Sequence, residues 1–166
     1  MNMHKENGFT LIELIVVIVL VSTLSLIAWP RFFSIQVDSR IAAMNGLKAS
    51  ILTANEQVFG KSIIEGIDKL PEHKLVIDRK NNVAVWVRYG YPVWLGMSVH
   101  ELLHVNLDEW FYGVNSGNEK EHTLRFGLSK IFNTPRDLMS DDAKKCFVVV
   151  KNTLKAVSVE VISDEC

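Results

Sequence analysis

The sequence predicts an α+β fold in which one long N-terminal helix packs on an antiparallel β-sheet. Three observations predict it. The first is an apolar block from Phe9 to Trp29, FTLIELIVVIVLVSTLSLIAW, and the second is the amphipathic helical pattern that follows it. The third is a C-terminal part in which short segments alternate apolar and polar residues, as half-buried strands do. The chain has 166 residues, enough for one domain with an appendage.

The apolar block is long enough to cross a membrane. As a helix it would span about 31 Å, close to the ~30 Å hydrocarbon core of a bilayer. A secretory signal peptide would have a shorter apolar core and small residues before its cleavage site, and the best site here, Thr23-Leu24-Ser25, is poor. A run this apolar on every face is also unlike a core helix. We therefore expect a membrane-inserted segment.

Glu13 is the single charged residue of the block. A carboxylate within a bilayer costs about 3 kcal/mol or more, so an intramembrane acid is by default a functional residue. The alternative is that its side chain only reaches out to the headgroups.

Beyond Pro30 the pattern becomes amphipathic. Polar residues such as Asp38, Arg40 and Glu56 lie opposite an apolar face whose members recur every three or four positions: Val37, Ile41, Met44, Leu47, Ile51, Ala54 and Val58. We expect one helix from about residue 10 to about residue 59. We also expect a kink or local loosening at Pro30, because proline cannot donate a backbone hydrogen bond.

The remainder predicts a β-rich head. Residues 74–78 and 83–89 alternate around a turn-like 79–82, which indicates a β-hairpin. The pattern then favours these elements: a helix at 98–110, a strand at 123–131, and a terminal strand pair at 146–150 and 157–162.

The junction before the apolar block reads Gly8-Phe9-Thr10-Leu11-Ile12-Glu13-Leu14, after a polar stretch of eight residues. This stretch resembles the type IV prepilin signature. The resemblance implies cleavage between Gly8 and Phe9 by a membrane peptidase and N-methylation of Phe9. Gly8 suits such a site because it has no side chain to obstruct an extended backbone. The resemblance also implies that the new amino group of Phe9 neutralises Glu13 of a neighbouring subunit, and that the helix loosens near Pro30 during assembly.

The family resemblance divides the chain into four parts. They are a leader (1–8), a membrane and filament-core helix (9–30), its amphipathic continuation (31–66) and a globular head (67–166). The runs Pro-Arg-Phe-Phe, Gly-Leu-Lys-Ala and Val-Phe-Gly-Lys-Ser, with Tyr-Gly-Tyr-Pro at 89–92, are similar to the mannose-sensitive haemagglutinin (MSHA) pilin group.

This similarity implies a non-enzymatic pilus subunit that serves adhesion or surface attachment. A minor pilin or a type II secretion pseudopilin is the alternative. The expected partners are further copies of the chain, a prepilin peptidase and methyltransferase, a pilus assembly platform, the inner membrane and a surface receptor. The expected location is the inner membrane of a Gram-negative bacterium, then an extracellular pilus. We expect no cofactor, and the net charge of −1 does not favour nucleic-acid binding.

The chain has two cysteines, Cys146 and Cys166. An exported domain meets an oxidising compartment, where a disulfide is the default. The predicted terminal strand pair would bring its two ends together, as a disulfide requires. Many pilins close a C-terminal loop in this way.

The sequence His100-Glu101-Leu102-Leu103-His104 matches the H-E-x-x-H motif, whose histidines share a helix face and bind zinc. The possible third ligands, Glu119, Glu121 and His122, lie in a polar stretch without a companion motif, and the head is small for a metalloprotease. We therefore expect a chance match and no metal site, with a membrane-anchored zinc hydrolase as a remote alternative.

Three further acids, Asp137, Asp141 and Asp142, lack the spacing of a calcium loop. We expect them in solvated turns and at a helix start.

Overall fold

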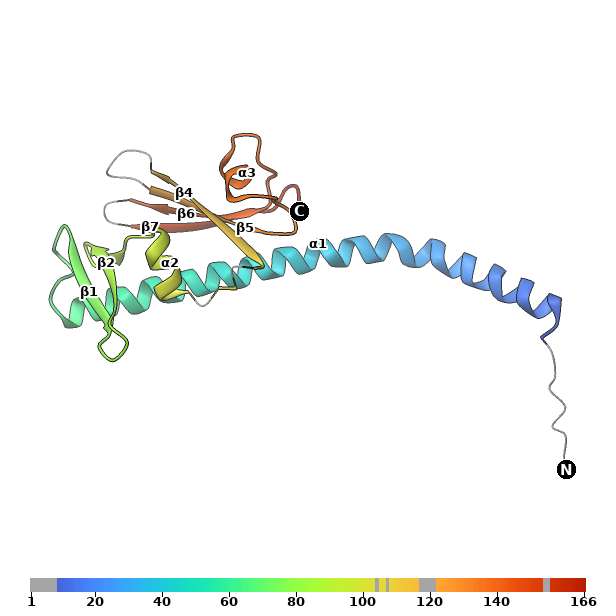
Figure 1. Cartoon of the computed structure of the whole chain (residues 1–166), viewed down its shortest axis with the longest axis horizontal. Helices are drawn as coiled ribbons and strands as arrows, with labels where there is room; N and C mark the ends of the chain where they lie inside the picture. The colour runs from blue at the N-terminus through green and yellow to red at the C-terminus, as the bar shows by residue number, and fades with distance from the viewer. Residues whose placement is uncertain (1–8, 104, 107, 117–121, 154–155) are drawn as a thin grey trace, which may run out of the picture. The chain divides into compact units, whose positions relative to one another are not determined.

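The computed structural model describes residues 9–103, 105–106, 108–116, 122–153 and 156–166. The helices and strands follow one another in this order (Figure 1): α1 (Leu11–Ile64), β1 (His73–Asp78), β2 (Val83–Arg88), β3 (Tyr91–Pro92), α2 (Gly96–Leu102), β4 (Trp110–Ser116), β5 (His122–Leu128), α3 (Pro135–Met139), β6 (Phe147–Asn152) and β7 (Val157–Ile162).

The chain divides into two compact units, Met1–Ser39 and Arg40–Cys166, and α1 contributes to both. The second unit is a long helix segment packed against antiparallel sheets, a pilin-like α+β fold, so the predicted fold class is confirmed. Two sheets are present among the described residues: β1-β2-β3, and β4-β5-β6-β7.

The second half of α1 supplies one wall of the head. Its predicted apolar face is buried at Met44, Leu47, Ile51, Ala54 and Val58. Most of these side chains join the inner face of β5 and β6 in one core, and Figure 1 shows the four-stranded sheet lying along this part of the helix. The periodicity of three and four therefore identified the packed face correctly.

The helix ends five residues later than expected, at Ile64. Gly66 follows in the left-handed region with φ 69°, which glycine adopts without strain. The Gly66 N–H donates to the Ile63 carbonyl at 3.0 Å and the Ile67 N–H to the Ser62 carbonyl at 2.9 Å, a Schellman ending. The sequence analysis ended the amphipathic continuation at residue 66, which is this glycine.

The predicted hairpin is present as β1 and β2, with Leu75 opposite Val85. Asp78 shapes its turn: one side-chain oxygen accepts the Lys80 N–H at 2.7 Å, and Asn82 takes a positive φ of 54°. A second core beneath this sheet contains Val58, Ile67, Leu75, Val85 and Val87.

The helix expected over 98–110 is wrong beyond its first turns. The structure has α2 at Gly96–Leu102, and Trp110 already begins β4. Between them, the Asn106 side chain accepts the Asp108 N–H at 3.0 Å and the Asn106 carbonyl accepts the Trp110 N–H at 3.1 Å. Asparagine and aspartate favour such local bonds over helical ones, so the chain turns here.

The sequence prediction also lacked β3 and β4, and it gave only a helix start, without bounds, for α3. Short α3 covers the outer face of the four-stranded sheet, where Phe132, Leu138, Phe147 and Val149 form a third core. Gly127 makes room for this core, since a Cβ at this position would lie 2.6 Å from the Phe132 ring and 2.8 Å from Leu138 Cδ1 of α3. A single sheet was expected, whereas the strands form two.

Candidate functional site: the N-terminal segment and the C-terminal disulfide

The first unit of the chain presents an apolar helix with exposed side chains. Every side chain from Phe9 to Trp29 is exposed, and that of Phe9 is 79% exposed. A helix that is apolar on all sides normally lies within lipid or among other helices. In the part of the chain that the structure describes, α1 is the helix long and apolar enough to cross a membrane.

The hydroxyl groups of this segment bond to the helix itself. Ser22 Oγ donates to the Ile18 carbonyl and Ser25 Oγ to the Val21 carbonyl, both at 2.7 Å, and Thr23 Oγ1 donates to a carbonyl at 2.9 Å. A polar group buried without a partner costs free energy, but these three have partners within the helix. The segment can therefore enter an apolar environment without losing hydroxyl hydrogen bonds.

Glu13 closes the first turn of α1 on Thr10. The Glu13 Oε2 atom accepts the Thr10 N–H at 3.0 Å and the Thr10 hydroxyl at 2.8 Å, while Thr10 Oγ1 accepts the Glu13 N–H at 3.4 Å. This reciprocal pair is a capping box, and it also places a carboxylate at the positive end of the helix dipole. Thr10 was missed in the sequence analysis, although Thr-x-x-Glu before an apolar run is a recognisable signal.

The predicted cleavage site lies at the edge of the described chain. Gly8 is outside the described residues, and Phe9 precedes the capping residue Thr10 as exposed, non-helical backbone. Cleavage after Gly8 and methylation of Phe9 stay predictions. Pro30 lies inside α1, which continues through it, and its loosening likewise stays a prediction.

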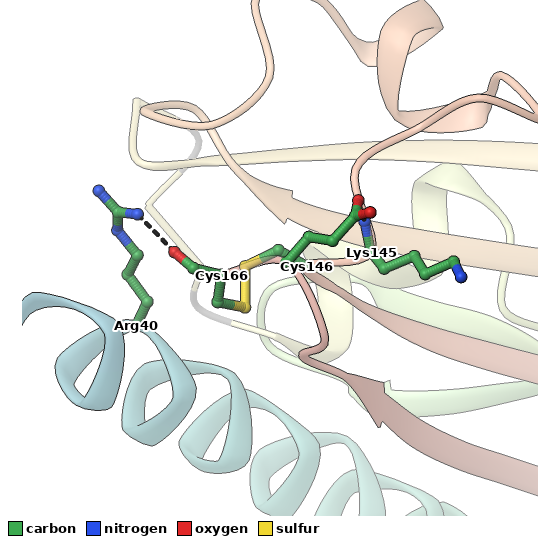
Figure 2. The surroundings of a disulfide bond; sticks show 5 residues. Arg40, Lys145, Cys146 and Cys166 are labelled. Atoms are coloured by element: carbon green, nitrogen blue, oxygen red, sulfur yellow. Dashed lines mark hydrogen bonds between the residues drawn. A yellow bond between two sulfur atoms is a disulfide. The ribbon is translucent and has the colours of Figure 1, made fainter. Parts of the chain in front are cut away.

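The expected disulfide joins Cys146 and Cys166, whose Cα atoms are 4.9 Å apart (Figure 2). Cys146 is fully buried in the main core. The backbone around the bridge is held as well: the Lys145 N–H donates to Glu165 Oε2 at 2.9 Å, and the Glu165 N–H donates to the Lys145 carbonyl at 3.1 Å. The C-terminal segment is thus fastened to the start of β6.

Arg40 fastens the same segment to α1. Its Nη1 atom donates to the Cys166 carbonyl at 2.7 Å, as the dashed line in Figure 2 marks. The sequence analysis placed Arg40 opposite the apolar face of the helix, whereas its side chain is half-buried and bonds to the C-terminal segment. Its partner lies 126 residues away in the chain, so no local pattern could reveal it.

The H-E-x-x-H residues lie on and after α2. Val99 and Leu103 are buried in the core, while His100 is exposed and its Nε2 atom lies 2.9 Å from the Tyr112 hydroxyl. Glu101 is exposed, and His104 lies outside the described residues. Among the described residues, no three metal-ligating side chains come together.

Asp137 occupies the helix start expected for it. It is the third residue of α3, and its carboxylate accepts the Thr134 N–H at 3.0 Å, while Thr134 Oγ1 accepts the Asp137 N–H at 3.2 Å. Asp137 therefore has a structural role, as part of the capping box that begins α3.

Comparison with known proteins identifies the N-terminal segment. Residues 3–29 match the family described as the prokaryotic N-terminal methylation motif. The chain has no match among curated proteins or among solved structures. The motif is the class signal of type IV pilins and pseudopilins, and it implies prepilin peptidase processing and filament assembly in general. Together with the pilin-like fold, it makes this chain a type IV pilin-like or pseudopilin-like subunit.

Proposed function

We propose that the chain is a structural subunit of an MSHA-type type IV pilus, which polymerises through its N-terminal helix and serves adhesion or surface attachment. One observation carries the proposal: the apolar part of α1, up to Trp29, is exposed on every side and has one carboxylate, Glu13, in its first turn. A helix of this kind is suited to intermolecular packing rather than to an intramolecular core.

Burial of the exposed apolar side chains favours placing the N-terminal helix first in the membrane and then in the filament. Burying one Val, Leu or Ile side chain contributes about 1.5–3 kcal/mol, and the segment exposes many of them. The inner membrane covers these side chains before assembly, and the helices of neighbouring subunits cover them in the filament. The head remains outside, which suits an extracellular pilus carrying a receptor-binding surface.

Glu13 sets the axial offset between neighbouring helices through a charge pair. Cleavage between Gly8 and Phe9, followed by methylation of Phe9, leaves a cationic amine on the residue before Thr10. In the subunit the capping box satisfies the carboxylate, and in the filament the amine of an adjacent Phe9 neutralises it. An unpaired charge in an apolar interior costs about 3–5 kcal/mol, so this pairing favours one axial offset between subunits.

The experiment that tests this role of Glu13 replaces it with glutamine. Glutamine keeps the carbonyl oxygen that a capping box requires but removes the charge, so Glu13→Gln tests the charge itself. We expect the variant to be cleaved and methylated normally, by mass spectrometry, and to yield few or no sheared filaments by electron microscopy.

Two controls make this result specific. Glu56→Gln removes a charge from an exposed position of the same helix and should leave piliation unchanged. Thr10→Val removes the capping hydroxyl but keeps the Glu13 charge. Normal piliation in cells carrying only Glu13→Gln would contradict the proposal.

Deletion of the gene separates the proposed major pilin from the minor pilin or pseudopilin. Loss of all fibres, with this chain as their bulk protein in wild-type cells, supports a major subunit. Fibres that persist without the chain would contradict that assignment and favour the alternative.

A further inference from the structure

We propose that Trp29, Arg31, Phe32 and Phe33 form an interfacial anchor that holds the unassembled subunit at the membrane–water boundary farther from Glu13. The partner is the headgroup and glycerol region of an anionic phospholipid bilayer. The inference rests on the membrane-inserted stage of the proposed function and adds the residues that set its depth.

The aromatic side chains form one exposed cluster on α1. Trp29, Phe32 and Phe33 are 70%, 63% and 55% exposed, and the Trp29 and Phe33 rings meet edge to face with centroids 5.8 Å apart. Together with Ser25, Ala28 and Gln36 they line a shallow groove along one helix face. Rings of this kind prefer the headgroup level, where an amphipathic indole has lipid on one side and water on the other.

The position of the cluster along the helix agrees with the thickness of a bilayer. Trp29 follows Phe9 by about 30 Å at ~1.5 Å per residue, which is the thickness of the hydrocarbon core. When the Phe9 end lies at one boundary, the Trp29 ring therefore lies at the other. Glu13 is then one turn inside the first boundary.

Pro30 supplies an independent reason for a boundary at this level. It has no N–H, so the Leu26 carbonyl cannot receive the usual helical hydrogen bond from residue 30. In hydrocarbon an unsatisfied carbonyl costs several kcal/mol, whereas at the interface water can bond to it. A boundary near Trp29 thus places the gap in the hydrogen-bond ladder where water is available.

Charge favours lipid over a second copy of the helix as the occupant. Arg31 is exposed directly beyond Trp29, and the next polar side chains outward are Ser34, Gln36 and Asp38. A guanidinium at this level attracts anionic headgroups, with about 1 kcal/mol for each basic residue near the surface. A helix packed into the groove would supply neither the anion for Arg31 nor the water for the Leu26 carbonyl.

The first experiment measures the depth of Trp29 in the full chain. The protein is reconstituted at low density in vesicles of phosphatidylcholine and phosphatidylglycerol that carry a nitroxide quencher at a shallow, middle or deep position of the acyl chain. Subtracting the signal of Trp29→Phe removes the emission of Trp86, Trp94 and Trp110. We expect the greatest loss of Trp29 emission with the shallow quencher.

Three results would overturn the anchor. They are maximal quenching at the bilayer centre, absence of quenching at every depth, and protection of Trp29 that grows with protein density, which would place a second copy on the groove.

The second experiment tests whether the cluster sets the depth. A nitroxide is attached to the exposed position Val21→Cys, with the native cysteines held in their disulfide, and its accessibility to oxygen and to a polar relaxant is compared. The triple variant Trp29→Ala, Phe32→Ala, Phe33→Ala should shift the label's depth. The control Leu20→Ala, Leu24→Ala, which removes apolar area inside the span, should not. An equal shift of the label's depth in the triple variant and the control, or no shift in the triple variant, would refute the anchor.

These measurements use unassembled subunits, so they are independent of filament formation. A chain that is anchored as described but never forms filaments would contradict the proposed function and leave the anchor standing. A chain that assembles normally but has Trp29 at the bilayer centre would contradict the anchor and leave the proposed function standing.

Discussion

Removing the Cys146–Cys166 bridge should destabilise the head by about 3 kcal/mol. The cysteines are separated by 20 positions, and closing a loop of this size removes about that much conformational free energy from the unfolded chain. The double variant Cys146→Ala, Cys166→Ala is suitable because alanine puts no polar group at the fully buried position 146. For a unit of this size the loss corresponds to a Tm about 10 °C lower.

The assay is urea unfolding of the full chain in a non-ionic detergent, followed by tryptophan emission. Trp94 and Trp110 are buried in the core that the disulfide closes, so they report on the head. The oxidised wild type should unfold at higher urea than the double variant. Wild type treated with reductant should unfold like the variant. A difference in the free energy of unfolding below about 1 kcal/mol would refute the loop-closure reasoning.

Three further predictions concern the head. Gly127→Ala should destabilise it by about 1–3 kcal/mol in urea unfolding, because the new Cβ lies 2.8 Å from Leu138 Cδ1. Asn55→Ala should cost about 1–3 kcal/mol by the same assay, because it leaves the buried Trp94 Nε1, now 2.8 Å from Asn55 Oδ1, without its acceptor. Hydrogen bonds from the Lys80 backbone and from Asn81 lower the pKa of Asp78, so its stabilising effect is present above its ordinary pKa of about 4 and is lost as pH falls through the lower folded value. The stability difference between wild type and Asp78→Ala should therefore shrink below about pH 4.

The elements that the sequence predicted are those with strong local signals. Helical periodicity located α1 and its buried face, and alternation around a turn located the β1–β2 hairpin. The helix expected through Trp110 was wrong because Asn106 turns the chain and Trp110 then pairs with Leu128 on the following strand. The extent and packing of short α3 were not predicted, because they depend on space left by glycines in the sheet beneath it.

The candidate site was predictable in part for the same reason. Glu13 stands out because it is a lone charge in an apolar run, and the cysteine pairing followed from the expected compartment and the family resemblance. Thr10 carried a readable capping signal that was overlooked. Arg40 could not be assigned, since only the fold brings it to the Cys166 carbonyl.

The most direct test of the whole account is mass spectrometry of the subunit in filaments sheared from cells that produce it. We expect an N-terminal peptide that begins at Phe9 and carries one methyl group on its amine, in a chain whose Cys146 and Cys166 are joined. A filament protein that retains Met1, or filaments that lack this chain altogether, would contradict the assignment of residues 9–29 as an assembly segment.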